Sequence, residues 1–293
     1  MANRIVRRMF YLAALLLIGG NASAVESLAG SQWVQASTFE PLSAEELFSA
    51  IFKRIEQVKA QGRQPVVMVD LDETLYDFRP RNRAVYLTWA EENAKNVHFA
   101  RVLSSSPLLL SQRSPFDMAK ILDSSGVSYD QEEIEALISY WQTYSQSNNW
   151  VHLDQPFPHS VEMLNALYSA GTKIIYMTSR FENMREGTEG NLVRDGFPLK
   201  EQGCPLIMRV SPRSQQVAWQ LKVNALQRVM LEDPQVELVA TIDNEPGTAV
   251  ALRAQFSRAY HVFMHSWFGE RSAEVVHEGL FYILGFPKVD ECL

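Results

Sequence analysis

Two aspartates, Asp70 and Asp72, end the apolar run VVMVDLDETLYDF at residues 66–78. Because successive strand residues face opposite sides of a sheet, positions 70 and 72 face the same side if the strand continues through them. Two carboxylates about 4 Å apart repel each other by about 4 kcal/mol at an effective dielectric constant of about 20. A cation is therefore the expected third member of this pair. The alternative is a strand that stops at a polar turn, with Asp72 and Thr74 capping the following helix.

Short apolar runs bounded by Gly, Pro or polar turns follow, and helical segments separate them. These runs suit buried parallel strands and lie at 172–179, 204–210, 236–243 and 258–264. The alternation predicts an α/β fold, a doubly wound parallel sheet with helices on both faces. Ligands of such sheets bind outside the carboxyl ends of the strands. Polar residues at or near these ends are Thr178, Ser179 and Arg180, then Lys222 on the helix before the fourth strand, then Asp243, Asn244 and Glu245.

A helix precedes the first of these strands. Ser43 and Glu46 have the spacing of a capping box, and Gly62 provides a stop signal. The pattern predicts a helix that leads directly into the strand at 65–70. The residues before this helix, 25–42, have no periodic pattern and are expected to be loosely structured.

The first 24 residues have the layout of a secretory signal peptide. Three arginines, the apolar run MFYLAALLLIGG and the small-residue sequence ASA at 22–24 predict cleavage after Ala24. The apolar run is too short to span a bilayer comfortably, and no cysteine follows it to carry a lipid. We therefore expect an exported protein, periplasmic or secreted, with no stable membrane anchor. Loss of three arginines and no acids lowers the formal net charge from −7 to −10, and no basic block remains for binding a nucleic-acid duplex.

An insertion interrupts the alternation of strands and helices. About 100 residues separate Asp72 from the strand at 172, far more than one crossover requires, and they show several helical patterns. The predicted organisation is a signal peptide at 1–24, a lead-in with the helix and first core strand at 25–80, a helical cap insert at 81–155, and the remainder of the core at 156–293. The two cysteines, Cys204 and Cys292, could form a disulfide or remain as two thiols.

Four motifs in this order resemble those of the haloacid dehalogenase (HAD) superfamily: DxDxT at 70–74, a strand ending at Thr178, a lysine at Lys222 and a strand ending at Asp243. DLDET and TSRFENMREGTEGNLVRDGFP are together similar to the secreted class B and C acid phosphatases of that superfamily. One departure lies in the last motif. Those families commonly carry a second aspartate four residues after the first, where this sequence has Gly247. Either Glu245 or water would then complete the site.

The resemblance implies an exported Mg²⁺-dependent phosphatase that hydrolyses small phosphomonoesters. Asp70 would be the nucleophile and form an aspartyl-phosphate, and Asp72 would act as general acid and then as general base. The expected Mg²⁺ ligands are Asp70, the backbone carbonyl of Asp72, and Asp243, with Glu245 as a further candidate.

The resemblance also implies roles for residues on the neighbouring elements. Thr178 would bind a phosphoryl oxygen, and Lys222 would offset negative charge between Asp70 and the phosphate, with Lys200 as the alternative lysine. Candidate substrate-binding residues are Thr74, Ser179 and Arg180; the equal alternative for Arg180 is an ion pair with a nearby acid. The partner is a small-molecule phosphate ester. Two other functions stay open: a phosphotransferase that uses the same intermediate, and a catalytically silent binding protein with this fold.

Overall fold

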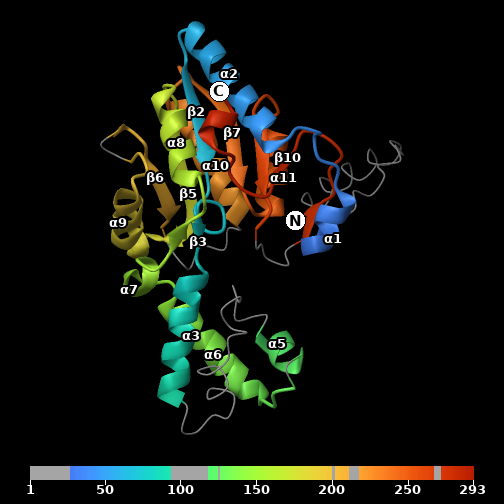
Figure 1. Ribbon diagram of the computed structural model, residues 1–293, viewed down its shortest axis with the longest axis vertical. Coiled ribbons are helices and arrows are strands. Elements are labelled where there is room, and N and C mark those ends of the chain that lie inside the picture. Colours follow the sequence, from blue (N-terminus) through green and yellow to red (C-terminus); the bar gives the residue numbers. More distant parts are fainter. Residues whose placement is uncertain (1–26, 94–117, 125, 200–201, 211–217, 267–271) are drawn as a thin grey trace, which may run out of the picture.

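The structure of the protein is a computed structural model that describes residues 27–93, 118–124, 126–199, 202–210, 218–266 and 272–293. The predicted signal peptide, its cleavage site and Lys200 lie outside these residues. A parallel sheet forms the core, with six strands in the order β10-β8-β7-β2-β5-β6 (Figure 1). The strands are β2 (Gln64–Val69), β5 (Lys173–Phe181), β6 (Leu206–Arg209), β7 (Val236–Asp243), β8 (Tyr260–Met264) and β10 (Phe281–Ile283).

Helices cover both faces of this sheet. They are α2 (Ala44–Ala60), α8 (Ser160–Ser169), α9 (Arg185–Asp195), α10 (Ala218–Glu232) and α11 (Pro246–Gln255). In β2, Val67 and Val69 pack in one buried cluster and Val66 and Met68 in another, as expected when successive side chains face opposite sides. Both faces of β2 are therefore buried, which explains its continuous apolar sequence. The predicted doubly wound parallel sheet is confirmed.

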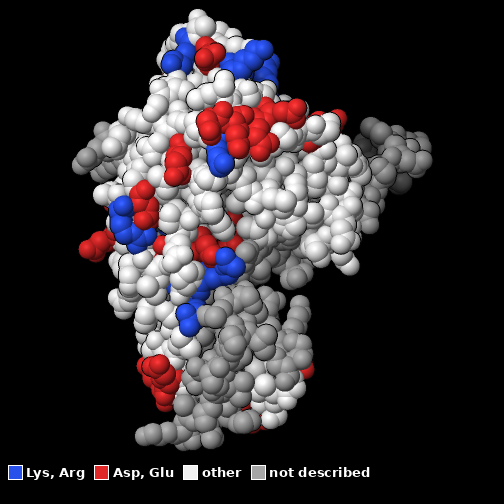
Figure 2. Space-filling view, in the orientation of Figure 1, with Lys and Arg blue, Asp and Glu red and all other residues white. Residues whose placement is uncertain are grey.

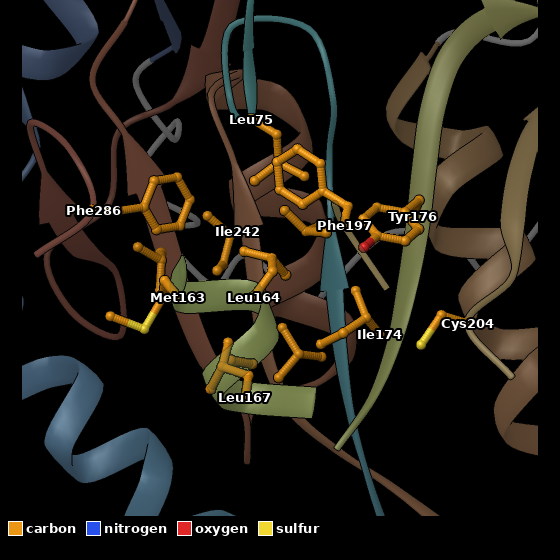
Figure 3. Packing of buried hydrophobic residues seen from close by; sticks show 14 of the residues in the cluster. Leu75, Met163, Leu164, Leu167, Ile174, Tyr176, Phe197, Cys204, Ile242 and Phe286 are labelled. Carbon is orange, nitrogen blue, oxygen red and sulfur yellow. The ribbon is translucent and has the colours of Figure 1, made fainter. Parts of the chain in front are cut away.

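Helix α8 shows how one face is filled. Its residues Met163, Leu164 and Leu167 point toward Ile174 of β5 and Ile242 of β7 (Figure 3). All five side chains are buried. Because burying one such side chain contributes about 1.5–3 kcal/mol, this layer fixes α8 on the sheet.

The chain reverses its direction of winding at β2. From β2 it proceeds to β5 and β6 on one side, and β7, β8 and β10 extend the sheet on the other side. The carboxyl end of β2 is therefore the topological switch point, where ligands of open α/β sheets bind. Asp70 and Asp72 lie directly after this end.

Several local predictions agree with the structure and one is wrong. Helix α2 has the predicted capping box between Ser43 and Glu46. Residues 25–42 were expected to be loosely structured, but they contain β1 (Ser27–Ala29), which pairs with β9 (Ser272–Glu274), and α1 (Gly30–Ala36). The reason is tertiary packing: Trp33 is fully buried and its indole N–H donates to the carbonyl of Glu274 at 2.7 Å.

The helical insert lies beside the carboxyl end of the sheet (Figure 1). A short antiparallel strand pair, β3 (Tyr76–Asp77) with β4 (Gln155–Pro156), joins its two ends to the core. The insert has its own apolar cluster, which includes Tyr86, Trp89 and Leu137. Its described helices are α3 (Arg79–Asn93), α5 (Met118–Ser124), α6 (Gln131–Tyr144) and α7 (Asn148–Val151).

Both cysteines are buried free thiols in the main apolar cluster, so Cys204 and Cys292 do not form a disulfide in this structure. Within the ranges that the structure describes, we find no helix with the length and apolar character needed to cross a bilayer.

Candidate active site

Lys222 joins two buried aspartates at the switch point. Its Nζ lies 2.8 Å from Oδ1 of Asp70, which follows β2, and 2.7 Å from Oδ2 of Asp243, which ends β7. The three side chains are between 1% and 7% exposed. β2 and β7 are neighbours, and α10 precedes β7 in the chain, so the βα connections of the sheet bring these residues together.

The charges of this group are strongly coupled. Burial raises the pKa of Asp70 to about 7, against the opposing attraction of Lys222, and the nearby charge of Asp243 raises it further. Burial alone would lower the pKa of Lys222, but its ion pairs with Asp243 and Asp70 raise it above its usual range. Two carboxylates and one ammonium leave one negative charge when all three are ionised.

This donor set fits Mg²⁺ in a minimal form. Mg²⁺ binds proteins through one or two carboxylates, and phosphate and water supply its other ligands. Asp70 and Asp243 would supply the two carboxylates. The backbone N–H of Glu245 donates to Oδ1 of Asp243 at 2.9 Å, and Glu245 precedes α11 as its N-cap. Among the described residues, no group of three or more His, Cys, Asp or Glu side chains is arranged to hold a metal. The ligand role of Glu245 therefore stays a prediction.

Asp72 lies in a second charged cluster with two arginines. Its Oδ1 accepts from Arg180 Nη2 at 2.6 Å and from Arg81 Nη2 at 2.8 Å, and its Oδ2 accepts from Arg180 Nε at 3.0 Å. Asp154 completes the cluster, with Oδ2 2.7 Å from Arg180 Nη2 and Oδ1 3.0 Å from Arg81 Nε. Two arginines and two aspartates make this four-residue cluster electrically balanced.

Exposure differs sharply among these four residues. The side chain of Asp72 is 28% exposed, whereas those of Arg81, Arg180 and Asp154 are 4%, 1% and 0% exposed. Burial favours the neutral form of Asp72, but Arg180 and Arg81 outweigh it and hold its pKa below its usual range. Burial raises the pKa of Asp154, against both arginines. Asp72 is thus the member of the cluster that is open to a bound molecule.

The cluster also connects the insert to the core. Arg81 lies in the first turn of α3, where the insert begins, and Asp154 directly precedes β4, where it ends. Arg180 belongs to β5 of the core. Figure 2 shows acidic and basic groups side by side near the junction of core and insert, and otherwise only small, separate basic groups on that face.

The remaining predicted residues lie at the same edge of the sheet. Thr178 is 6% exposed, and its Oγ1 accepts from the backbone N–H of Arg180 at 3.2 Å. Thr74 is fully buried, and its Oγ1 donates to Oδ1 of Asn244 at 3.4 Å. Ser179 is exposed. Strand β5 continues through Phe181, beyond the predicted end, so Thr178, Ser179 and Arg180 are strand residues with alternating directions.

Sequence reasoning missed Arg81 and Asp154. They lie 73 positions apart in the printed sequence and next to the predicted boundaries of the insert. A charged residue at each boundary of an insertion is the signal that could have suggested a link between them. The contact between Arg81 and Asp154 depends on the pairing of β3 with β4, which no local sequence pattern predicted.

Fold and site together define a doubly wound α/β protein with a lysine-linked aspartate pair at its switch point. No family model matches the chain, and no curated protein matches its sequence. Solved structures match at low identity. A HAD hydrolase of family IA, variant 3, from Entamoeba histolytica is 11% identical, with 78% of this chain and 97% of that chain covered and a TM-score of 0.43.

Two further structures extend the comparison. The class C acid phosphatase from Bacillus anthracis, with tungstate bound, is 17% identical over 79% of this chain and 83% of that chain, with a TM-score of 0.35. Protein tyrosine kinase A from Mycobacterium tuberculosis is 16% identical over 78% of this chain and 95% of that chain, with a TM-score of 0.47. These likenesses concern the fold alone. The structure itself confirms the predicted architecture, a parallel sheet with a helical insert.

Proposed function

We propose that this protein is an exported, Mg²⁺-dependent phosphatase that hydrolyses small phosphomonoesters through an aspartyl-phosphate at Asp70. One observation carries the proposal: Lys222 joins Asp70 and Asp243 in a buried group at the switch point of the sheet. A carboxylate held at that point beside a cation is placed for attack on a phosphate. The helical insert beside it would cover the ester group.

The first step belongs to Asp70. A carboxylate oxygen attacks phosphorus, the bond from phosphorus to the ester oxygen breaks, and the alcohol oxygen leaves with the bonding electrons. Lys222 attracts the negative charge that gathers between Asp70 and the phosphate. Bound Mg²⁺, held by Asp70 and Asp243, would neutralise phosphate charge that otherwise repels the nucleophile. Thr178 would donate to a phosphoryl oxygen.

The second step belongs to Asp72. As a carboxylate it accepts a proton from water, whose oxygen attacks phosphorus and breaks the bond to Asp70, releasing phosphate. Donating a proton in the first step is harder, because Arg180 and Arg81 stabilise the ionised form of Asp72. Leaving groups that are stable without a proton should therefore depart fastest, so aryl phosphates should react faster than alkyl phosphates.

The test is hydrolysis of p-nitrophenyl phosphate with Mg²⁺ and with a chelator. We expect the chelator to stop turnover, and Asp70→Asn to lower kcat by about a thousandfold or more. Asp77→Asn is the matched control, because Asp77 pairs with Arg79 outside the lysine-linked group. Turnover by Asp70→Asn near that of the wild type would refute the mechanism. Inactivity of the wild type on aryl and alkyl esters would favour a silent binding protein.

Two further measurements address the finer points. Added glycerol as a phosphoryl acceptor distinguishes a hydrolase, which releases only inorganic phosphate, from a phosphotransferase, which also forms glycerol phosphate. Export is checked by fractionating producing cells and sequencing the mature amino terminus, which we expect to be Val25 after cleavage behind Ala24.

A further inference from the structure

A cavity of about 370 Å³ lies next to the catalytic group, between β5, β6 and α10. Thr178 and Lys222 form part of its wall, so the cavity adjoins the proposed phosphate position. Its volume is within the range of small-molecule sites. The cavity therefore offers space for a part of the substrate other than the reacting phosphate.

The charge of the cavity wall is unusual for this protein. The chain has a formal net charge of −7, yet the described residues that line the cavity include three cations and no acid. Lys222 is neutralised by Asp70 and Asp243. The other two cations are Arg209 and Arg228. Arg228 thus adds to the wall a positive charge that the catalytic group does not use.

The two arginines differ in their surroundings. The guanidinium of Arg209 lies 5.3 Å from the ring centroid of Phe181 and is engaged in a cation–π contact there. Arg228 is exposed on α10 and has neither an ion pair nor a hydrogen bond with any residue that the structure describes. An arginine without an internal partner in a cavity wall is suited to bind an anion from outside the protein.

The spacing along α10 sets the size of the expected ligand. Arg228 follows Lys222 by six residues, which corresponds to roughly 9 Å of helix rise. The cavity wall also includes apolar side chains such as Met177 and Ile207. A molecule with two anionic groups separated by a short carbon chain would match the two cations and the apolar part of the wall.

We propose that the cavity is a subsite for a second anionic group of the substrate, a phosphate or a carboxylate, which Arg228 binds while the reacting phosphate lies at Asp70. The proposal rests on the proposed phosphatase function and names its substrate class: phosphate esters with a second anion about four carbons away. Arg228 is then a specificity-determining residue. Its exposed position lets it be replaced without disturbing the core.

The experiment compares kcat/KM for three esters: butyl phosphate, butane-1,4-diyl bisphosphate and 5-(phosphonooxy)pentanoate. For the wild type we expect kcat/KM to be higher for the two doubly anionic esters than for butyl phosphate. In Arg228→Gln this preference should fall by about tenfold to a hundredfold, the usual effect of losing a hydrogen bond to a charged group. Arg228→Lys should retain part of it, because the charge remains.

Leu231→Glu is the matched control. It lowers the net charge by the same one unit, on the same helix, at a position that is 81% exposed and outside the cavity wall. We expect Leu231→Glu to keep the wild-type preference. A preference for the bisphosphate but not for the carboxylate would identify the second anion as phosphate.

The outcomes separate this inference from the proposed function. If the wild type hydrolyses all three esters with equal kcat/KM, or if Arg228→Gln and Leu231→Glu change the preference equally, the subsite is overturned and the phosphatase stands. If the wild type hydrolyses none of the three esters and no aryl phosphate, both proposals are overturned.

Discussion

Removing the charge of Asp154 should unfold the protein at much lower denaturant concentrations. Asp154 has a fully buried side chain and makes ion pairs of 2.7 Å with Arg180 and 3.0 Å with Arg81. Asp154→Asn keeps the shape of the side chain but leaves two buried guanidinium groups with Asp72 as their single carboxylate partner. Because Asp72 is 28% exposed, water screens part of its charge.

The expected loss follows from the burial of the two arginines. Breaking a buried ion pair by removing one partner typically costs about 3–5 kcal/mol, since the remaining charge is uncompensated. That is a large fraction of the 5–15 kcal/mol by which domains are usually stable. Replacing Arg81 by Gln in the same variant balances the charges of the cluster again, because one arginine, Arg180, then faces one aspartate, Asp72. The double variant should therefore lose less than the sum of the two single variants.

Urea unfolding at pH 7, followed by tryptophan fluorescence and circular dichroism, measures these changes. Glu182→Gln is the control, because Glu182 pairs with Arg185 at the surface, where both side chains are more than a third exposed. Such pairs contribute about 0–1 kcal/mol. If Asp154→Asn stays within about 1 kcal/mol of the wild type, or if the single losses add without coupling, the four-residue cluster does not join insert and core as described.

Two further predictions concern the metal and acid pH. Asp243→Asn should raise the Mg²⁺ concentration needed for activity strongly, and Glu245→Gln by only about 10- to 100-fold; magnesium titrations giving the reverse order would move the ligand to Glu245. Burial lowers the pKa of His261 to about 4 in the folded protein, whereas its pKa in the unfolded chain is about 6.5. Between these two values only the unfolded chain takes up the proton, so the stability of the folded state falls as the pH drops. Between pH 6.5 and 5 we expect His261 to account for about 1.5 kcal/mol of this loss. The measurement is the difference in urea stability between the wild type and His261→Asn at each pH, and a difference that does not change with pH would contradict the prediction.

Much of the core was predictable because its signals are local. The capping box of Ser43 and Glu46 acts within one helical turn, and it places the start of α2 correctly. The predicted strand at 236–243 is β7 without change, because its sequence is mostly apolar and nearly all of its residues are buried on both faces. Asp70 and Asp243 could be placed at one edge because carboxyl ends of neighbouring parallel strands meet there.

Other features depend on contacts between distant segments. Strand β10 was not predicted, and it pairs with β8 to complete the sheet. The prediction that residues 25–42 are loosely structured was wrong. Their order comes from a distant contact, since Trp33 packs against Phe263 of β8 with ring centroids 5.1 Å apart, and no local pattern indicates this contact. β5 extends beyond its predicted end, and its pairing with β6 reaches Phe181.

The sequence by itself determined the order of the elements and the residue types at the carboxyl ends of the strands. It favoured Lys222 and kept Lys200 as the alternative, because helix position alone does not show which lysine reaches a neighbouring strand. The tertiary structure brings Lys222 to Asp70 and Asp243. It also surrounds Asp72 with two arginines, one from the insert and one from the core, so a residue expected to donate a proton is held as a carboxylate. The physical reason is that ionisation depends on burial and on charges a few ångströms away, and these are set only when distant parts of the chain meet.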